Sequence, residues 1–288
     1  MKIKTAVALL LMLSVAQPLK VAAQSKIDET STLPSKILNS DRKFSIYLPD
    51  GYDRDNRSYP VLYLLHGMGD DHTGWVQYGE VQRIADKAIA DGSSAPMIIV
   101  MPDASGLKVG YFNAVDGKSN YEDFFIKEFI PFIEKNYRCR SDKQYRAIAG
   151  LSLGGGASLV YALHHPELFS SCSPLSAAIF TFAHSKTLRE SYAKENVSEK
   201  VMSDWVDKND ILKLVNEMPD SLKHSVRWSI DIGDDDFLFE GNSMLHIIMR
   251  KNNIPHEFRI RDGAHTWSYW RSALPNVLTF ATQIFHRF

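Results

Sequence analysis

Short apolar runs alternate with helix-length segments along most of this 288-residue chain. Val61 to Leu65 (VLYLL) and Met97 to Met101 (MIIVM) are apolar without interruption, which is typical of parallel strands buried on both faces. The alternation predicts an α/β fold in which helices cover both sides of a mostly parallel sheet, with the first strand or two antiparallel at its edge. Further strands are predicted at 43–48, 145–149, 172–177, 226–232 and 257–260, and helices at 81–90, 121–137, 155–164, 241–251 and 275–288.

One segment departs from this alternation. Residues 180–223 are long, polar and of helical pattern, and they lie between two predicted strands. We therefore expect a helical excursion over the sheet at this point. Because no internal repeat and no Pro/Ser-rich linker divides the remainder, residues 24–288 are predicted to form a single domain.

The first residues resemble an export signal. Lys2 and Lys4 precede an apolar run from Ala6 to Leu13, and Val21-Ala22-Ala23 supplies small residues before a cleavage point. We predict a signal peptide over residues 1–23 and a periplasmic or secreted product. The apolar run is shorter than the roughly 20 residues that a membrane-spanning helix needs, so stable membrane insertion is not expected.

Charge and cysteine content exclude several functional classes. The chain has 33 Lys+Arg and 34 Asp+Glu, and removal of the predicted signal peptide takes away three lysines, leaving 30 − 34 = −4. Without a basic stripe, nucleic acid is not an expected partner. Neither C-x-x-C nor H-E-x-x-H occurs, so no metal site is expected. Cys139 and Cys172 admit two interpretations, a disulfide of an exported protein or two buried free thiols.

Ser152 lies between Gly150 and Gly154 at the junction of a predicted strand and a predicted helix. The G-x-S-x-G pattern alone also arises by chance in glycine-rich turns. Its position between strand and helix indicates a nucleophile elbow, in which a strained serine requires small neighbours two residues away. The amides that begin the following helix would then point toward developing negative charge. Ser152 is therefore the candidate nucleophile, and it needs a base that an acid orients.

His265 is the candidate base. It follows the last predicted strand, in a loop that begins with Asp262-Gly263, and the carboxyl ends of strands in open α/β sheets carry the functional sites. His66 precedes the serine and ends a strand, which does not fit the expected chain order. His164 and His165 are expected to cap the end of a helix at the surface.

Three adjacent aspartates after the penultimate strand are candidates for the acid. Asp234, Asp235 and Asp236 all lie in the predicted loop, and a run of acids usually forms a solvated face. Asp236 precedes the apolar pair Phe237-Leu238, so we predict that it turns inward and orients the base. Asp235 is the alternative.

Two backbone amides are needed to stabilise the oxyanion of an acyl-transfer reaction. One is expected from Leu153, directly after the nucleophile. The other is expected from Met68, in the glycine-rich turn of "YLLHGMGDDHTGW" that follows an early strand. A plain β-to-α turn is the alternative interpretation of that stretch.

Six stretches of the chain together resemble a known family. "YLLHGMGDDHTGW", "PMIIVMPDA", "YEDFFIKEFIPFIEKNYR", "AIAGLSLGGGAS", "DIGDDDF" and "DGAHTWSYW" are similar to esterase-D-type α/β-hydrolases, and nearest to carbohydrate esterase family 1, which holds feruloyl and acetyl xylan esterases. The resemblance covers nearly all of the chain after residue 23. It implies an α/β-hydrolase fold, a Ser-His-Asp triad and no cofactor or metal. In the family the acid lies three residues after the glycine of a G-x-x-D turn, which on Gly233 selects Asp236.

These observations predict an exported serine carboxylic-ester hydrolase that releases ferulate or related hydroxycinnamates from plant cell-wall polysaccharide. An acetyl xylan esterase, or another carboxylesterase or thioesterase of the same fold, is the enzymatic alternative. A catalytically silent carbohydrate-binding relative is the non-enzymatic one. Aromatic residues expected on loops around the site would stack on a ferulate or sugar ring, although ordinary packing is an equal alternative for each of them. They are Trp75, Trp267 and Trp270, with Tyr78, Tyr111 and Phe112 as further candidates.

Overall fold

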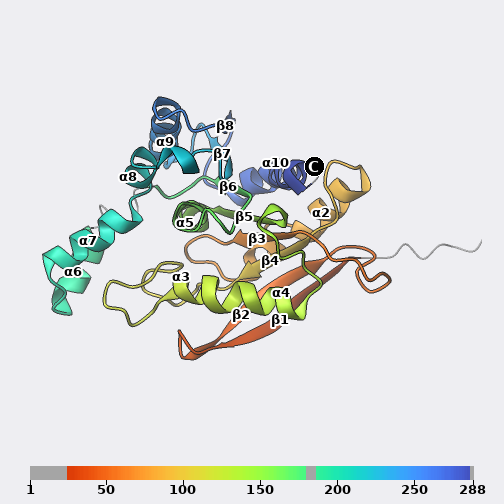
Figure 1. Cartoon of the computed structure of the whole chain (residues 1–288), viewed down its shortest axis with the longest axis horizontal. Coiled ribbons are helices and arrows are strands. Elements are labelled where there is room, and N and C mark those ends of the chain that lie inside the picture. Colours follow the sequence, from red (N-terminus) through yellow and green to blue (C-terminus); the bar gives the residue numbers. More distant parts are fainter. Residues whose placement is uncertain (1–24, 180–185, 286–288) are drawn as a thin grey trace, which may run out of the picture.

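An eight-stranded sheet forms the centre of the computed structural model, which describes residues 25–179 and 186–285 (Figure 1). The strand order is β1-β2-β4-β3-β5-β6-β7-β8. The strands β1 and β2 pair antiparallel, as do β2 and β4, and all other pairs are parallel. The predicted mostly parallel sheet with an antiparallel edge is confirmed. Its strands are β1 (Lys26–Ser35), β2 (Ser40–Leu48), β3 (Val61–Leu65), β4 (Ile98–Pro102), β5 (Arg146–Leu151), β6 (Ser171–Leu175), β7 (Arg227–Gly233) and β8 (His256–Arg261).

Helices cover both faces of the sheet. One face packs against α1 (Gly74–Gln77), α2 (Val81–Ala90) and α10 (Trp267–Phe285). The other packs against α3 (Tyr121–Phe124), the π-helical turn η1 (Phe125–Phe129), α4 (Ile130–Asn136), α5 (Ser152–His164), α8 (Ile211–Asn216) and α9 (Phe239–Lys251). Single 3₁₀ turns lie at η2 (Lys143–Tyr145) and η3 (Asp220–Leu222).

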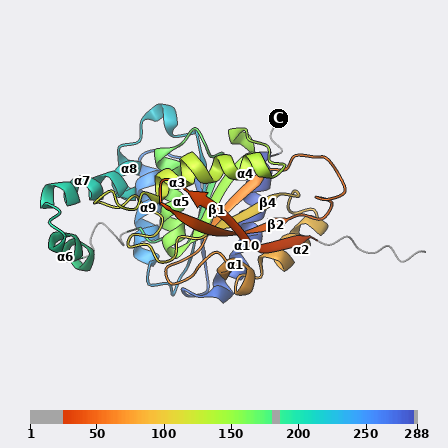
Figure 2. The ribbon, with the colours of Figure 1, turned by 90° about the horizontal axis from the view of Figure 1, so that it is seen from below.

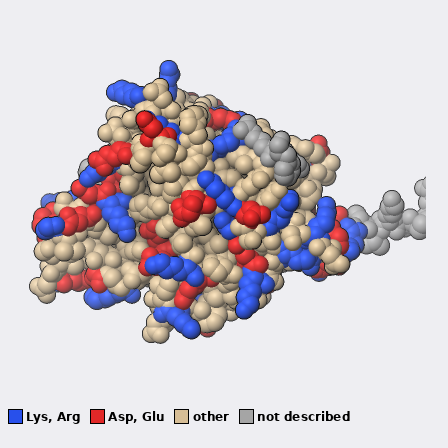
Figure 3. All heavy atoms as spheres, in the orientation of Figure 1, with Lys and Arg blue, Asp and Glu red and all other residues tan. Residues whose placement is uncertain are grey.

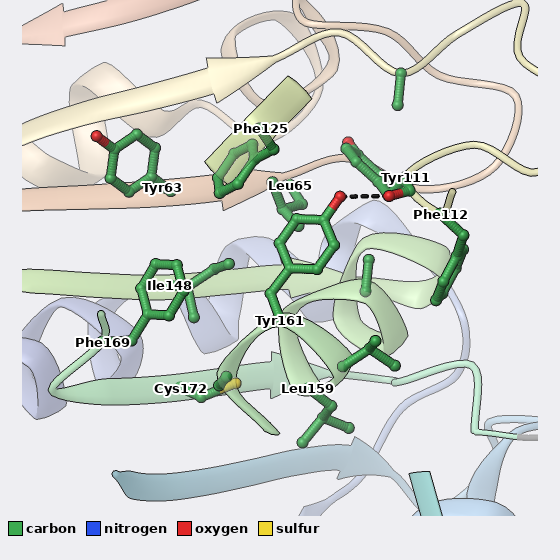
Figure 4. Close-up of a cluster of buried hydrophobic side chains, with 14 of the residues drawn as sticks. Tyr63, Leu65, Tyr111, Phe112, Phe125, Ile148, Leu159, Tyr161, Phe169 and Cys172 are labelled. Atoms are coloured by element: carbon green, nitrogen blue, oxygen red, sulfur yellow. Dashed lines mark hydrogen bonds between the residues drawn. The ribbon is translucent and has the colours of Figure 1, made fainter. Parts of the chain in front are cut away.

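The continuous apolar run of β3 is explained by burial on both faces. Tyr63 and Leu65 point into the cluster under α5, whereas Leu62 and Leu64 point into the cluster under α2 and α10, and all four are fully buried. Figure 4 shows the first of these clusters, in which the Tyr161 hydroxyl of α5 donates to the backbone carbonyl of Tyr111. This bond ties α5 to the segment between β4 and α3.

The predicted excursion is also present. Its helices α6 (Lys186–Lys194) and α7 (Glu199–Asn209) project from the body beside α8 in both Figure 1 and Figure 2. Ser198 caps α7 by accepting from the Val201 amide. The Trp205 indole N–H donates to the carbonyl of Asn113, which fastens α7 to the segment before α3.

Among the differences from the predicted elements, three bear on the site and the sheet edge. The strand β1 was not expected, α5 begins at Ser152 rather than at Gly155, and α10 begins at Trp267 rather than at Pro275. The predicted signal peptide, residues 1–23, lies outside the described residues.

The surface charge, the two cysteines and the helices can be compared with what the composition predicted. Lys/Arg and Asp/Glu side chains are interspersed on the face in Figure 3. Cys139 and Cys172 are separate free thiols, and burial raises the pKa of each to about 12. Within residues 25–179 and 186–285, no helix is long and apolar enough to cross a membrane.

Candidate active site

Ser152 lies at a sharp turn between the end of β5 and the start of α5. Its φ of 54° is in the left-handed region, which is uncommon for a residue other than glycine. A Cβ added to Gly150 would lie 2.5 Å from the Gly154 backbone, and one added to Gly154 would lie 2.5 Å from the carbonyl oxygen of His66. Both positions therefore require glycine, which is the reason for the G-x-S-x-G pattern.

The structure joins Ser152, His265 and Asp236 by hydrogen bonds. The His265 Nε2 atom lies 2.9 Å from the Ser152 Oγ atom, and its Nδ1 atom lies 2.9 and 3.1 Å from the two carboxylate oxygens of Asp236. Because an ionised carboxylate only accepts hydrogen bonds, Nδ1 carries the proton and Nε2 is free to accept the serine hydroxyl. This is the arrangement of a nucleophile, a base and an orienting acid.

Burial separates Asp236 from its two neighbours. Its side chain has no exposed surface, whereas Asp234 and Asp235 are exposed. Burial raises the pKa of Asp236, but hydrogen bonds from His265, the Leu238 amide and Ser176 outweigh this effect and hold the pKa below its ordinary value. Asp236 is therefore an ionised acceptor.

The apolar residue that follows Asp236 does not account for its inward orientation. Phe237 is 77% exposed, and its ring lies 4.5 Å from that of His265. The reason for the inward turn is instead polar, since the carboxylate is held by the donors that converge on it.

The glycine-rich turn after β3 passes alongside the nucleophile. A Cβ added to Gly67 would lie 3.5 Å from the Ser152 Cβ. Met68 and Leu153, the two predicted oxyanion donors, line the same cavity. The predicted residues thus lie together, with the start of α5 directed at the site.

His66 contributes to this turn in a way that the sequence analysis missed. Its Nε2 atom accepts from the Ala104 amide (3.1 Å), so the ring proton is on Nδ1, which donates to the Gly67 carbonyl (2.8 Å). Burial lowers the pKa of His66, which keeps the ring neutral. In the planar peptide that follows, the Met68 N–H points away from this ring. The signal in the sequence was a histidine directly before glycine at the carboxyl end of a strand.

A cavity of about 400 Å³ lies beside the nucleophile. Its walls come from residues 66–70 and 104–110, and Leu153 adjoins it from α5. Met68, Leu107 and Val109 give the walls apolar surface, while Asp70 and Lys108 supply charge. Burial raises the pKa of Asp70, as does the neighbouring charge of Asp71.

The three tryptophans predicted to bind substrate lie on helices rather than loops. Trp75 of α1 is fully buried and donates to the Leu65 carbonyl, so it has no face for a ligand. Trp270 of α10 is 6% exposed and contacts the His265 ring edge-on, with 4.9 Å between ring centroids. Trp267 is half-buried against Trp75, Tyr78 and Trp270. For Trp75 and Trp270 the packing alternative is therefore correct.

Fold and site together define an α/β-hydrolase with a Ser-His-Asp arrangement. Residues 35–281 match the esterase family described as "Putative esterase". The chain therefore belongs to this esterase family.

Individual relatives agree with this assignment. A solved structure of a ferulic acid esterase is 39% identical, with a TM-score of 0.80 over 91% of this chain and 99% of the other. An endo-1,4-beta-xylanase/feruloyl esterase of Xylanibacter ruminicola is 40% identical over 47% of this chain and 19% of its own length. The fold is also that of a ferulic acid esterase from Anaeromyces mucronatus solved with ferulic acid, which is 21% identical with a TM-score of 0.66 over 91% of each chain. The chain is thus a ferulic acid esterase-like member of the family.

Proposed function

We propose that the protein is a serine carboxylic-ester hydrolase that forms an acyl-enzyme on Ser152. The observation that carries this proposal is the continuous hydrogen-bonded chain from Asp236 through His265 to Ser152. As the Ser152 Oγ atom attacks the ester carbonyl, His265 Nε2 takes its proton. The alcohol leaves with that proton, and a water molecule, activated by the same nitrogen, then releases the acid and restores the serine.

The oxyanion formed in both steps lies opposite the amides of Leu153 and Met68. Leu153 lies in the first turn of α5, where unpaired amides and the helix dipole favour negative charge. His66 holds the peptide that precedes Met68. Preorganised donors of this kind need no rearrangement as the charge develops, which is why they lower the barrier.

The acyl group that we propose is a hydroxycinnamate, ferulate first, esterified to plant cell-wall polysaccharide. The cavity of about 400 Å³ beside Leu153 supports an acyl group larger than acetyl. A feruloyl group offers an aromatic ring for its apolar walls and a phenol hydroxyl for Asp70 or Lys108. The likeness to ferulic acid esterases supports the same choice.

The experiment compares methyl ferulate and feruloylated arabinose with acetylated xylan, using the intact chain and its Ser152→Ala variant. We expect kcat/KM for the feruloyl esters to exceed that for acetyl groups by on the order of a hundredfold, because burying a ring contributes a few kcal/mol. Deacetylation without measurable ferulate release would refute the choice of acyl group. Equal hydrolysis by Ser152→Ala would refute the mechanism itself.

We further propose that the protein is exported. The basic residues, apolar run and small residues of positions 1–23 support this. Mass spectrometry of the exported fraction from an expressing bacterium is expected to find Gln24 at the N-terminus. Retention of the protein in the cytoplasm with Met1 still present would contradict export.

A further inference from the structure

Ser176 is a second serine held in a strained backbone beside the site. It directly follows β6, is fully buried and has a φ of 46°. Glycine is the residue that this conformation favours, and a serine there costs free energy. Strain of this kind persists where the side chain is needed, and the feature that glycine lacks is the hydroxyl.

The contacts of this hydroxyl fix its direction. The Trp270 indole N–H donates to the Ser176 Oγ atom at 3.0 Å. An indole nitrogen only donates, so this contact occupies an acceptor site of the serine and leaves its own proton free. Ser176 also helps to lower the pKa of Asp236, so this free proton is available to that carboxylate. A hydrogen bond thus runs from Trp270 to Ser176, and Ser176 in turn acts on Asp236.

The backbone after Ser176 contacts the nucleophile. The Ala178 amide donates to the Ser152 carbonyl oxygen at 2.9 Å. Between these contacts, the carbonyl of Ala177 accepts from the fully buried side chain of Asn242, whose oxygen accepts from the Ala177 amide. Residues 176–178 thus link the acid to the nucleophile by a short, doubly anchored segment.

We propose that Ser176 is a positioning residue for the hydrolysis, acting through Asp236 with Trp270 as its own anchor. The proposal rests on the proposed function, because it assigns Ser176 a role only in a reaction that uses Asp236 and His265. Ser176 touches neither substrate nor the reacting atoms.

The physical role is to hold the carboxylate in one orientation. Asp236 accepts from His265 with both oxygens and from the Leu238 amide with Oδ1. The Ser176 hydroxyl adds a donor that His265 does not supply, and it withdraws charge from the carboxylate. Without it the carboxylate is freer to rotate and binds the protonated imidazole more strongly. His265 would then be less often neutral at a given pH.

The test uses two substitutions that remove the hydroxyl with opposite effects on the backbone. Ser176→Ala keeps the strain of φ 46°, whereas Ser176→Gly relieves it. We expect both to lower kcat for methyl ferulate by on the order of tenfold, as for the loss of a hydrogen bond to a charged group, with KM unchanged. We also expect the acidic limb of the kcat/KM profile to move to higher pH in both.

Ser171→Ala is the matched control. Ser171 begins β6, the strand that Ser176 follows, and is 1% exposed, and its hydroxyl has no hydrogen-bond partner among the residues that the structure describes. This variant should keep the kcat and the pH profile of the unmodified protein. Thermal unfolding of all three variants reports whether each is folded, and Ser176→Gly is expected to fold even where the alanine variant does not.

Trp270→Phe supplies an independent check. It removes the indole donor while keeping an aromatic ring near His265, so it should lower kcat less than Ser176→Gly does. The double variant should be no slower than Ser176→Gly alone, because both changes act on one chain of bonds.

The outcomes separate this proposal from the proposed function. Ser176→Gly could keep the kcat and the acidic limb of the unmodified protein while Ser152→Ala is inactive. That result would overturn the role of Ser176 and leave the mechanism intact. Losses that differ between the alanine and glycine variants would assign the effect to the backbone and not to the hydroxyl. An active Ser152→Ala would overturn the proposed function instead.

Discussion

Asp235 and Asp236 are adjacent in the chain, yet the structure gives them opposite surroundings. Asp236 is buried against His265, while the Asp235 side chain is exposed and its amide donates to the Gly263 carbonyl. We predict that Asp236→Asn lowers kcat by about three to four orders of magnitude, because an amide cannot both orient His265 and stabilise its protonated form. Turnover of p-nitrophenyl acetate measures the loss, with circular dichroism to verify folding.

Asp235→Asn is the control for that substitution. It removes the same charge one position away without touching His265, and its kcat should stay close to that of the unmodified protein. If the exposed position were the damaging one, the acid would have been assigned wrongly. Ser152→Ala should be at least as inactive as Asp236→Asn, because it removes the nucleophile itself.

Some of these residues were predictable because the chemistry fixes their place along the chain. Serine at a strand-to-helix turn and histidine after the last strand follow from the order of strands in the sheet. Ser176 was not predictable, since its importance arises from a positive φ and from a contact with Trp270, which lies 94 positions further on. Trp270 was expected to face substrate because the helix that buries it was predicted to begin later.

Hydrogen bonds from one histidine link three helices. His164, at the end of α5, contacts Glu122 of α3 through Nδ1 (2.7 Å) and the Lys208 carbonyl of α7 through Nε2 (2.9 Å). Both partners are acceptors, so both ring nitrogens carry protons and the imidazole is cationic. His165 also contacts Glu122, at 3.1 Å. His164 lies at the end of α5 as predicted, but it is not at the surface, since only 12% of its side chain is exposed.

The contacts of His164 with Glu122 and Lys208 form a bridge between α3, α5 and α7. The pKa shifts of His164 and Glu122 define the pH range in which this bridge is stable. Burial lowers the pKa of His164, but the hydrogen bond and charge of Glu122 outweigh it and raise the pKa, against a small opposing effect of the Lys208 side chain. Burial raises the pKa of Glu122, while His164 and His165 bring it down to about 2. The contribution of His164 to the free energy of unfolding is complete below pH 6.5, the pKa of the unfolded chain, and is lost as the pH rises through the folded pKa. The contribution of Glu122 is present above pH 4.5, the pKa of the unfolded chain, and is lost as the pH falls toward 2.

We therefore predict that α7 loosens from the body in alkali. Relative to pH 6, protease cleavage within α6 and α7 at pH 9 should be about tenfold faster, since a hydrogen bond to a charged group contributes about 1.5–3 kcal/mol. In His164→Gln this dependence should largely disappear, after correction for the protease's own pH profile. His224→Gln, at an exposed histidine, is the control and should keep it. An identical pH dependence in His164→Gln would contradict the bridge.

Element boundaries were predicted where the local sequence pattern reveals them and missed where it does not. The sequence of β1, KIDETSTLPS, is mostly polar because this strand lies at the sheet edge, so it lacks an apolar pattern. The helix α10 continues through Pro275, although proline in a helix is usually found in the first turn, which is where the predicted helix began. Its first turns are held by packing, since Tyr269, Trp270 and Ala273 are buried. Tertiary contacts thus override the local signal.

At the scale of the whole molecule, the sheet holds the reacting groups while the excursion reaches the cavity wall. Lys108, in the segment that lines the cavity, pairs with Glu195 just after α6 at 2.6 Å. Its ammonium also lies 3.6 Å from the centre of the buried Tyr192 ring. The triad residues follow strands of the sheet, whereas the wall of the proposed acyl cavity contacts a helix pair that projects from the body (Figure 1). We therefore expect that substitutions can change substrate choice without changing the chemistry.

Glu195→Gln tests this separation, because Glu195 contacts the wall without lining the cavity itself. The pair is more than one-third exposed on the glutamate side, so solvent screens it and its contribution is about 0.2–1 kcal/mol. We expect KM for methyl ferulate to rise about twofold to fivefold with kcat unchanged, and hydrolysis of a small acetyl ester to stay the same. Glu199→Gln, which loses the contact with Arg189 inside the excursion, is the control and should leave both substrates unaffected. An equal rise in KM for the acetyl ester would mean that Lys108 and Glu195 act on the site as a whole and not on the acyl cavity.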